Sequence, residues 1–253
     1  MSRRATDSYR KRCLSLKILA IDSTAKVCTA ALCEDEVLCA LKSENAGMTH
    51  SETLLPMIES ILSEANLSVA DIDVFALSKG PGSFTGVRIG AATVKGLCFG
   101  RDRACVGVSS LEALAYNYID GDGIVVSAMD ARRDQVYCAI FRVSGRAVER
   151  LCDDMAISLT ELCEKCSGFS GERIYISGDG AKLAYNRLKE NESLTLVYDE
   201  ERAQQNAYSV ALCAYKAYMN GEGVSDSDLR PSYLRLAQAE RERLERLQNE
   251  KNK

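Results

Sequence analysis

The same order of strands and helices occurs twice along this 253-residue chain, and that repeat constrains the fold more than any single motif. Each half begins with a meander of three apolar segments and then alternates helices with strands, which predicts a sheet that continues with parallel strands. The segments IDSTAKVCTAAL and MDARRDQVYCAIF also place an apolar residue and Asp at equivalent points. The pattern therefore predicts a duplicated, two-lobed α/β fold.

The first half is expected to run from residue 17 to residue 119. Its predicted strands are 17–22, 27–33, 37–43, 74–78 and 104–110, and its predicted helices are about 50–65, 84–99 and 111–118. Thr49 and Glu52 match a capping box at the start of the first helix. Pro56 lies inside this helix and removes one backbone hydrogen bond, so we expect a kink there.

The turn Asp120–Gly123 is the predicted boundary, and the second lobe is expected to span 120–235. Its predicted strands are 123–130, 135–143, 146–152, 173–177 and 194–198, with helices from about 181 to 190 and from 207 to 219. Ser158 and Glu161 offer a second capping box. Residues 1–16 are expected to be a disordered tail, and 236–253 a charged helix exposed to solvent.

Composition excludes several classes of protein. The net charge of −4 leaves no general basic field for nucleic acid, so an RNA role would need a partner or a local basic patch. No apolar run approaches the roughly 20 residues that span a bilayer, so no membrane association is expected. The eleven cysteines are mostly scattered singly, which is typical of reduced thiols in the cytoplasm. Cys163 and Cys166 form one CxxC, but with one histidine in the chain they predict no zinc site.

The glycine-rich stretch SKGPGSFTGVRIGAAT, residues 78–93, lies between a predicted strand and a predicted helix. Val87 and Arg88 follow Gly86, so the Lys and Ser or Thr of a phosphate-binding P-loop are missing. The spacing GxGxxxG is one residue longer than a dinucleotide fingerprint. Glycine inside a helix is unfavourable, so Gly86, Gly90 and Gly96 together indicate close approach by another backbone or helix. That neighbour is either the chain's own sheet or a partner's helix.

Several motifs together resemble one family. They are KILAIDSTAKVCTAAL, the His50 helix with Leu54-Leu55-Pro56, SKGPGSFTGVRIGAATVKGL, VGVSSLEALA, MDARRDQVY, SGDGA and PSYLR. From about residue 17 to residue 235 the chain resembles the TsaB family, the bacterial partner subunits in synthesis of threonylcarbamoyladenosine (t6A) in tRNA. The resemblance implies the duplicated fold of actin, Hsp70 and sugar kinases. It also implies pairing with the catalytic paralogue TsaD and an ATPase, TsaE, with tRNA contacted through the complex.

The resemblance also implies what this chain lacks. Ser110 and Leu114 stand where the paralogue has the two histidines of its HxxxH metal motif, so no metal is expected here. ATPases of this superfamily follow the first Asp with glycine, whereas Ser23 follows Asp22. We expect no cofactor on this chain alone, and ATP and metal to belong to the partner subunits. The positions expected to be relics of the nucleotide loops are Asp22, Ser23, Asp130, Gly178 and Gly180.

The partner surface implied by the resemblance is a bundle made by helices 50–65 and 84–99. Its expected residues are His50, Leu54, Met57, Ser83, Phe84, Thr85, Gly86, Arg88, Gly90 and Thr93. An outward face predicts that Gly90→Arg folds but loses its partner. Three functions stay open at this point: a non-catalytic partner of TsaD, an independent kinase-like enzyme, and a self-associating homodimer with another role. His50 is either a polar residue of the first helical turn or a partner contact.

Overall fold

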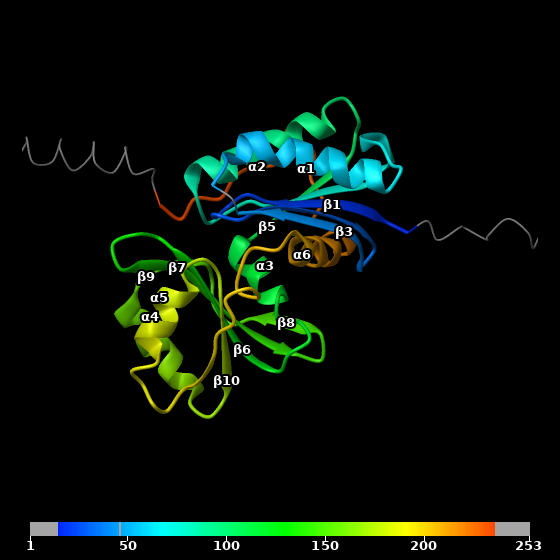
Figure 1. Cartoon of the computed structure of the whole chain (residues 1–253). Helices are drawn as coiled ribbons and strands as arrows, with labels where there is room; N and C mark the ends of the chain where they lie inside the picture. The colour runs from blue at the N-terminus through cyan, green and yellow to red at the C-terminus, as the bar shows by residue number, and fades with distance from the viewer. Residues whose placement is uncertain (1–14, 46, 236–253) are drawn as a thin grey trace, which may run out of the picture.

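A computed structural model describes residues 15–45 and 47–235, which form two lobes with one sheet each (Figure 1). The first sheet has the order β3-β2-β1-β4-β5. Its strands are β1 (Lys17–Asp22), β2 (Cys28–Glu34), β3 (Val37–Glu44), β4 (Val74–Ser78) and β5 (Ala104–Val108). The first three strands form the predicted antiparallel meander, and β4 and β5 continue the sheet in parallel with β1.

The second sheet repeats this topology with the order β11-β10-β6-β7-β8. Its strands are β6 (Gly123–Asp130), β7 (Gln135–Ser144), β8 (Ala147–Arg150), β10 (Arg173–Ser177) and β11 (Thr195–Val197), and β9 (Met155–Ser158) pairs with β7. Here too a meander leads, and the later strands β10 and β11 run parallel to the first. The predicted duplicated, two-lobed α/β fold is confirmed, because both sheets have the same strand order and the same strand directions.

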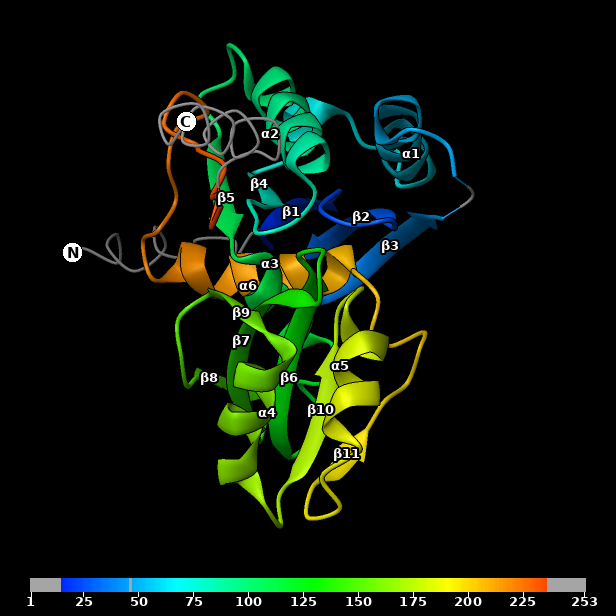
Figure 2. The same cartoon turned by 90° about the vertical axis from the view of Figure 1, so that its left-hand side faces the viewer.

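The last helix of each half lies between the two sheets (Figures 1 and 2). The helix α3 (Ser110–Tyr116) ends the first half, yet it packs on β6 and β7 of the second sheet. The helix α6 (Ala207–Met219) ends the second half and packs on β1, β2, β4 and β5 of the first. The two helices also contact each other. This exchange joins the lobes through buried apolar surface.

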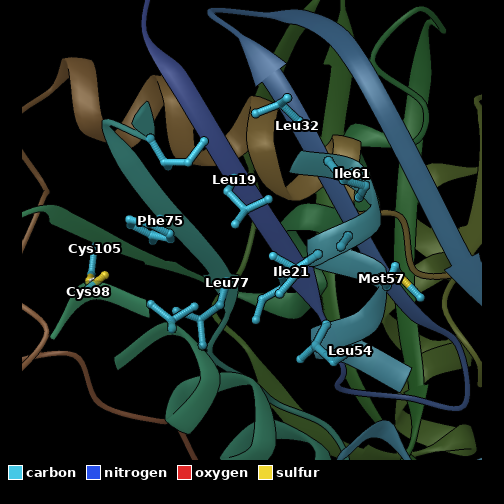
Figure 3. Close-up of a cluster of buried hydrophobic side chains, with 14 of the residues drawn as sticks. Leu19, Ile21, Leu32, Leu54, Met57, Ile61, Phe75, Leu77, Cys98 and Cys105 are labelled. Atoms are coloured by element: carbon cyan, nitrogen blue, oxygen red, sulfur yellow. Dashed lines mark hydrogen bonds between the residues drawn. The ribbon is translucent and has the colours of Figure 1, made fainter. Parts of the chain in front are cut away.

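The remaining helices cover the outer faces of the two sheets. They are α1 (His50–Glu64) and α2 (Phe84–Cys98) on the first sheet, and α4 (Leu159–Cys166) and α5 (Ala181–Leu188) on the second, with short 3-10 turns η1 (Val69–Asp71) and η2 (Ser167–Phe169). The apolar stripe of α1 meets the sheet through Leu54, Ile58 and Ile61, which are all buried. Figure 3 shows part of this core, including Phe75 and Leu77 of β4. Full burial of each such side chain stabilises the fold by about 1.5–3 kcal/mol.

The structure corrects several predicted boundaries. The strand β5 ends at Val108, two residues early, because Ser109 Oγ accepts from the backbone N–H of Glu112 (3.3 Å) and starts α3 at Ser110. The strand β8 is shorter than predicted, and β9 was not predicted at all. The helix α1 continues through Pro56.

The second capping box is confirmed: Ser158 Oγ accepts from the Glu161 N–H, and the Glu161 carboxylate accepts from the Ser158 N–H. The predicted C-terminal helix, 236–253, and almost all of the predicted N-terminal tail lie outside the described residues. Across residues 15–45 and 47–235, no helix has the length and apolar character to cross a membrane.

Candidate functional site

The turn after β1 is bonded entirely within the chain. Asp22 is buried, and its Oδ1 accepts from the backbone N–H and the hydroxyl of Thr24 (2.8 and 2.7 Å). Its Oδ2 accepts from Ser78 Oγ (2.6 Å). Burial raises the pKa of Asp22, and these hydrogen bonds oppose the shift only in part. The carboxyl group is therefore a structural anchor between β1, its turn and β4.

The N-terminus of α2 sits directly on this turn. Ser83 donates its backbone N–H to the carbonyl of Thr24 (2.6 Å), and Ser23 Oγ donates to the carbonyl of Gly86 (2.9 Å). A Cβ atom on Gly86 would lie 1.9 Å from the Ser23 carbonyl oxygen, and one on Gly90 would lie 2.6 Å from Ser23 Oγ. Only glycine permits this approach. The glycine-rich stretch thus shapes the chain's own fold.

This geometry corrects part of the predicted partner surface. Gly86 and Gly90 face the first lobe's own turn, so the prediction that they face a partner's helix is wrong. Leu54 and Met57 are also buried, in the core beneath α1. The inward face of each helix carries the small or apolar residues because that face meets the sheet. The same burial overturns the expectation that Gly90→Arg folds.

The other six predicted interface residues retain exposed surface. They are Ser83, Thr85 and Arg88, which are exposed, and His50, Phe84 and Thr93, which are partly buried. Ser83 Oγ accepts from the backbone N–H of Gly86 (3.2 Å) and so caps the N-terminus of α2. His50 Nε2 donates to the carbonyl of Ala25 (2.7 Å) and so ties the start of α1 to the β1 turn. These helices are therefore positioned by the same turn.

The equivalent loops of the second lobe face this turn across a cleft of about 660 Å³. Asp179 Oδ1 accepts from the backbone N–H of Asp130 (3.2 Å). Burial raises the pKa of Asp179 to about 6, with a further increase from the neighbouring Asp130 charge. Gly178 has φ +105°, and a Cβ there would lie 2.1 Å from the Ala128 carbonyl oxygen. A Cβ on Gly180 would lie 2.9 Å from the Asp130 backbone nitrogen.

The C-terminal segment PSYLR completes the cleft, a role that its sequence did not predict. Ser232 donates its backbone N–H to the carbonyl of Lys79 (2.7 Å). The Tyr233 ring lies 5.0 Å from the Phe84 ring, centroid to centroid, and its hydroxyl accepts from Arg88 Nε (3.1 Å). Arg235 extends to the second lobe, where it donates to the carbonyl of Ala131 (3.4 Å). The segment therefore contacts both lobes.

Comparisons with known proteins identify the family of this chain. A family model described as TsaD, tRNA N6-adenosine threonylcarbamoyltransferase, matches residues 42–243. The tRNA threonylcarbamoyladenosine biosynthesis protein TsaB of Escherichia coli is 32% identical over 87% of this chain and 95% of its own length. The Bacillus subtilis TsaB is 30% identical over 89% of this chain and 96% of its own. This chain belongs to the TsaB family.

A solved structure agrees with that assignment. YeaZ from Pseudomonas aeruginosa superposes with a TM-score of 0.74 at 26% identity, covering 87% of this chain and all of that one. In this TsaB-family chain, Ser110 and Leu114 are buried, and Leu114 Cδ1 lies 3.1 Å from where a Gly178 Cβ would be. The described part of the chain holds no cluster of three His, Cys, Asp or Glu side chains suited to a metal.

Proposed function

We propose that this chain is a non-catalytic subunit that binds and organises a TsaD-family catalytic subunit during t6A formation, with a TsaE-type ATPase joining the pair. Membership of the TsaB family supports a role in t6A biosynthesis. The observation that carries the non-catalytic role is the saturated Asp22 turn. Its carboxylate and the Ser23 hydroxyl are bonded within the chain, so neither group is free to bind a nucleotide's phosphates or their metal ion. ATP and metal are assigned to the partner subunits.

The outer face of α1 and α2 is the proposed partner surface. The two helices lie side by side on the first sheet (Figure 2). Leu55 of α1 is 45% exposed, and Phe99, which follows α2, is 80% exposed. Ala92 and Gly96 are exposed between Arg88 and Phe99, so a facing helix meets small side chains there. In isolation, a second copy of this chain is proposed to cover the same face as a homodimer.

The proposed compartment is the cytoplasm. Cys98 and Cys105 lie with their sulfur atoms 3.2 Å apart in the core of the first lobe, as thiols and not as a disulfide (Figure 3). Disulfides are rare in cytosolic proteins, where thiols are kept reduced.

Reconstitution tests the function directly. The isolated chain is expected to show negligible ATP turnover and no modification of tRNA. Mixing it with the TsaD homologue, the TsaE homologue, threonylcarbamoyl-adenylate, ATP and tRNA is expected to produce t6A, measured by mass spectrometry of digested tRNA. Omission of this chain is the control. Full activity without it would overturn the proposal, and robust turnover by the purified chain alone would favour the kinase-like alternative.

A surface variant tests the interface. Ala92→Arg places a charge on the exposed face of α2, and we expect an unchanged circular dichroism spectrum with loss of binding to the TsaD homologue by calorimetry, because burying that charge is unfavourable. Ala147→Arg, on an exposed residue of β8 in the second lobe, is the matched control and is expected to bind normally. Normal binding by a folded Ala92→Arg protein would refute the proposed surface.

A further inference from the structure

Basic side chains gather around the cleft between the lobes, although the whole chain has a net charge of −4. Five of them come from four separate segments: Lys26, Arg88, Arg132, Arg133 and Arg235. Lys26, Arg132 and Arg235 line the cleft itself, Arg88 stacks on its wall residue Phe84, and Arg133 is next to Arg132. None of the ion pairs found within residues 15–45 and 47–235 includes any of the five. Their charges are therefore open to an external anion.

The turn between β6 and β7 has an unusual backbone. Arg132, Arg133 and Asp134 have φ values of 67°, 55° and 55°, which is a run of three non-glycine residues in the left-handed region. Such residues are uncommon even singly, and they concentrate at functional sites. Asp130 stabilises the turn by accepting the Arg132 backbone N–H (2.7 Å). Both arginine side chains are exposed, so the turn presents two guanidinium groups to solvent.

Aromatic rings alternate with these charges. The Arg88 guanidinium lies 3.7 Å from the Phe84 centroid, and that of Arg235 lies 5.7 Å from the Tyr137 centroid. A guanidinium stacked on a ring keeps its N–H edge available for a phosphate. Tyr233 is 42% exposed and offers ring surface at the same cleft. Charged groups and stacking surface are therefore combined in one place.

Acidic groups also lie in and around the cleft. Asp130 and Asp179 line it, Asp134 belongs to the exposed turn, and Asp22 is buried beneath. Asp130 and Asp179 are bonded to backbone N–H groups of the second lobe's turn. The five basic groups outnumber the three acidic groups that reach solvent, Asp130, Asp134 and Asp179, so the charge around the cleft is net positive and attracts anions.

We propose that this cleft binds single-stranded RNA, with backbone phosphates at Arg132, Arg133 and Arg235 and a base against Tyr233. A volume of about 660 Å³ fits one or two nucleotides. Charges spread over several segments beside an exposed ring suit a strand, whose phosphates recur and whose bases stack. A free nucleotide needs one concentrated phosphate cradle, and the Asp22 turn is already bonded within the chain. The proposal goes beyond the proposed function, in which RNA is contacted only through the partner.

Fluorescence anisotropy on the isolated full-length chain tests the site. The probe is a labelled single-stranded RNA of about 12 nucleotides, titrated from about 50 to about 200 mM salt. We expect R132A/R133A to weaken binding at least tenfold and to reduce the slope of log affinity against log salt by about 1.4, since each phosphate contact on a single strand contributes about 0.7. Tyr233→Ala is expected to weaken binding about tenfold, and Tyr233→Phe to restore it, because stacking needs only the ring.

Two controls keep the assignment falsifiable. The double charge reversal K165E/K189E changes exposed lysines at the ends of α4 and α5, away from the cleft lining, and is expected to bind RNA normally. ATP and inorganic tripolyphosphate are the competing anions. Absence of RNA binding, an equal loss in K165E/K189E, or tighter binding of ATP or tripolyphosphate at the same arginines would each overturn the proposal. Because no partner is present, the result is separate from the reconstitution test.

Discussion

The first turn of each lobe occupies the same place in the duplicated fold but has opposite surroundings. Asp22 ends β1 and is buried, with both carboxylate oxygens bonded to Thr24 and Ser78. Asp130 ends β6 and is exposed, and its turn continues into the left-handed residues Arg132 and Arg133. One turn is part of the core, whereas the other is a solvent-facing loop.

The neighbouring helices explain this difference. In the first lobe, α2 starts beside the turn and its glycines let the helix backbone contact Ser23. In the second lobe, α5 starts at Ala181, and Gly180 lies against the backbone of Asp130 instead of covering the rest of the turn. In this duplicated fold, helix packing therefore buries the turn after β1, whereas the equivalent turn after β6 stays accessible to solvent.

The largest expected effect comes from removing the close approach in the first lobe. Gly86→Ala places a Cβ 1.9 Å from the Ser23 carbonyl oxygen, so α2 or the turn must shift, and we expect the free energy of unfolding to fall by about 3 kcal/mol or more. Gly96→Ala is the matched control in the same helix, because no atom outside the helix lies within 4 Å of its Cβ position. It is expected to stabilise the protein by up to about 1 kcal/mol. Urea unfolding measures the free energy of unfolding of both variants. Equal changes in the two would show that close packing of Gly86 against Ser23 is not what the alanine disrupts.

A second pair of variants compares the two aspartates. Asp22→Ala leaves two hydroxyls and one backbone N–H without their acceptor in a buried turn. We expect it to lower the free energy of unfolding by about 2–3 kcal/mol. Asp130→Ala removes an exposed acceptor and is expected to cost less than about 1 kcal/mol. Thermal and urea unfolding of the two proteins give the comparison. If Asp130→Ala lowers the free energy of unfolding more than Asp22→Ala does, the turns have been assigned the wrong roles.

The smallest expected effect depends on pH. The pKa of Asp179 is raised from 3.8 to about 6 in the folded protein, so its contribution to stability is fully present below pH 3.8 and is lost as pH rises through 6. We expect Asp179→Asn to be about 2 kcal/mol more stable than the natural protein at pH 7.5, with this advantage disappearing toward pH 4. Asn keeps an acceptor for the Asp130 N–H.

Asp153→Asn, at an exposed position of the second lobe, is the control for that series and is expected to change stability by less than about 0.5 kcal/mol at every pH. A difference between Asp179→Asn and the natural protein that does not vary with pH would show that burial of the Asp179 carboxyl is not its cause.

Much of the fold was predictable because it depends on local patterns. Alternating apolar residues located the strands, and the capping box Ser158–Glu161 located the start of α4. The short strand β9 was missed because its four residues pair only with β7 and carry no long pattern. The site was predicted less well. Asp22 and Asp130 were found through resemblance, but Arg132, Arg133 and Arg235 were not, since nothing local shows that they share one cleft.

The sequence by itself determined the duplicated order of elements, the chain's family and the lack of histidines for a metal site. Those properties reside in residue identity and short-range spacing. Tertiary structure alone decided which side of α2 faces the sheet and therefore why Gly86 and Gly90 are glycines. It also decided that α3 and α6 exchange sheets and that PSYLR contacts both lobes. These features depend on contacts between residues distant in sequence, whose geometry is fixed only when the core is packed.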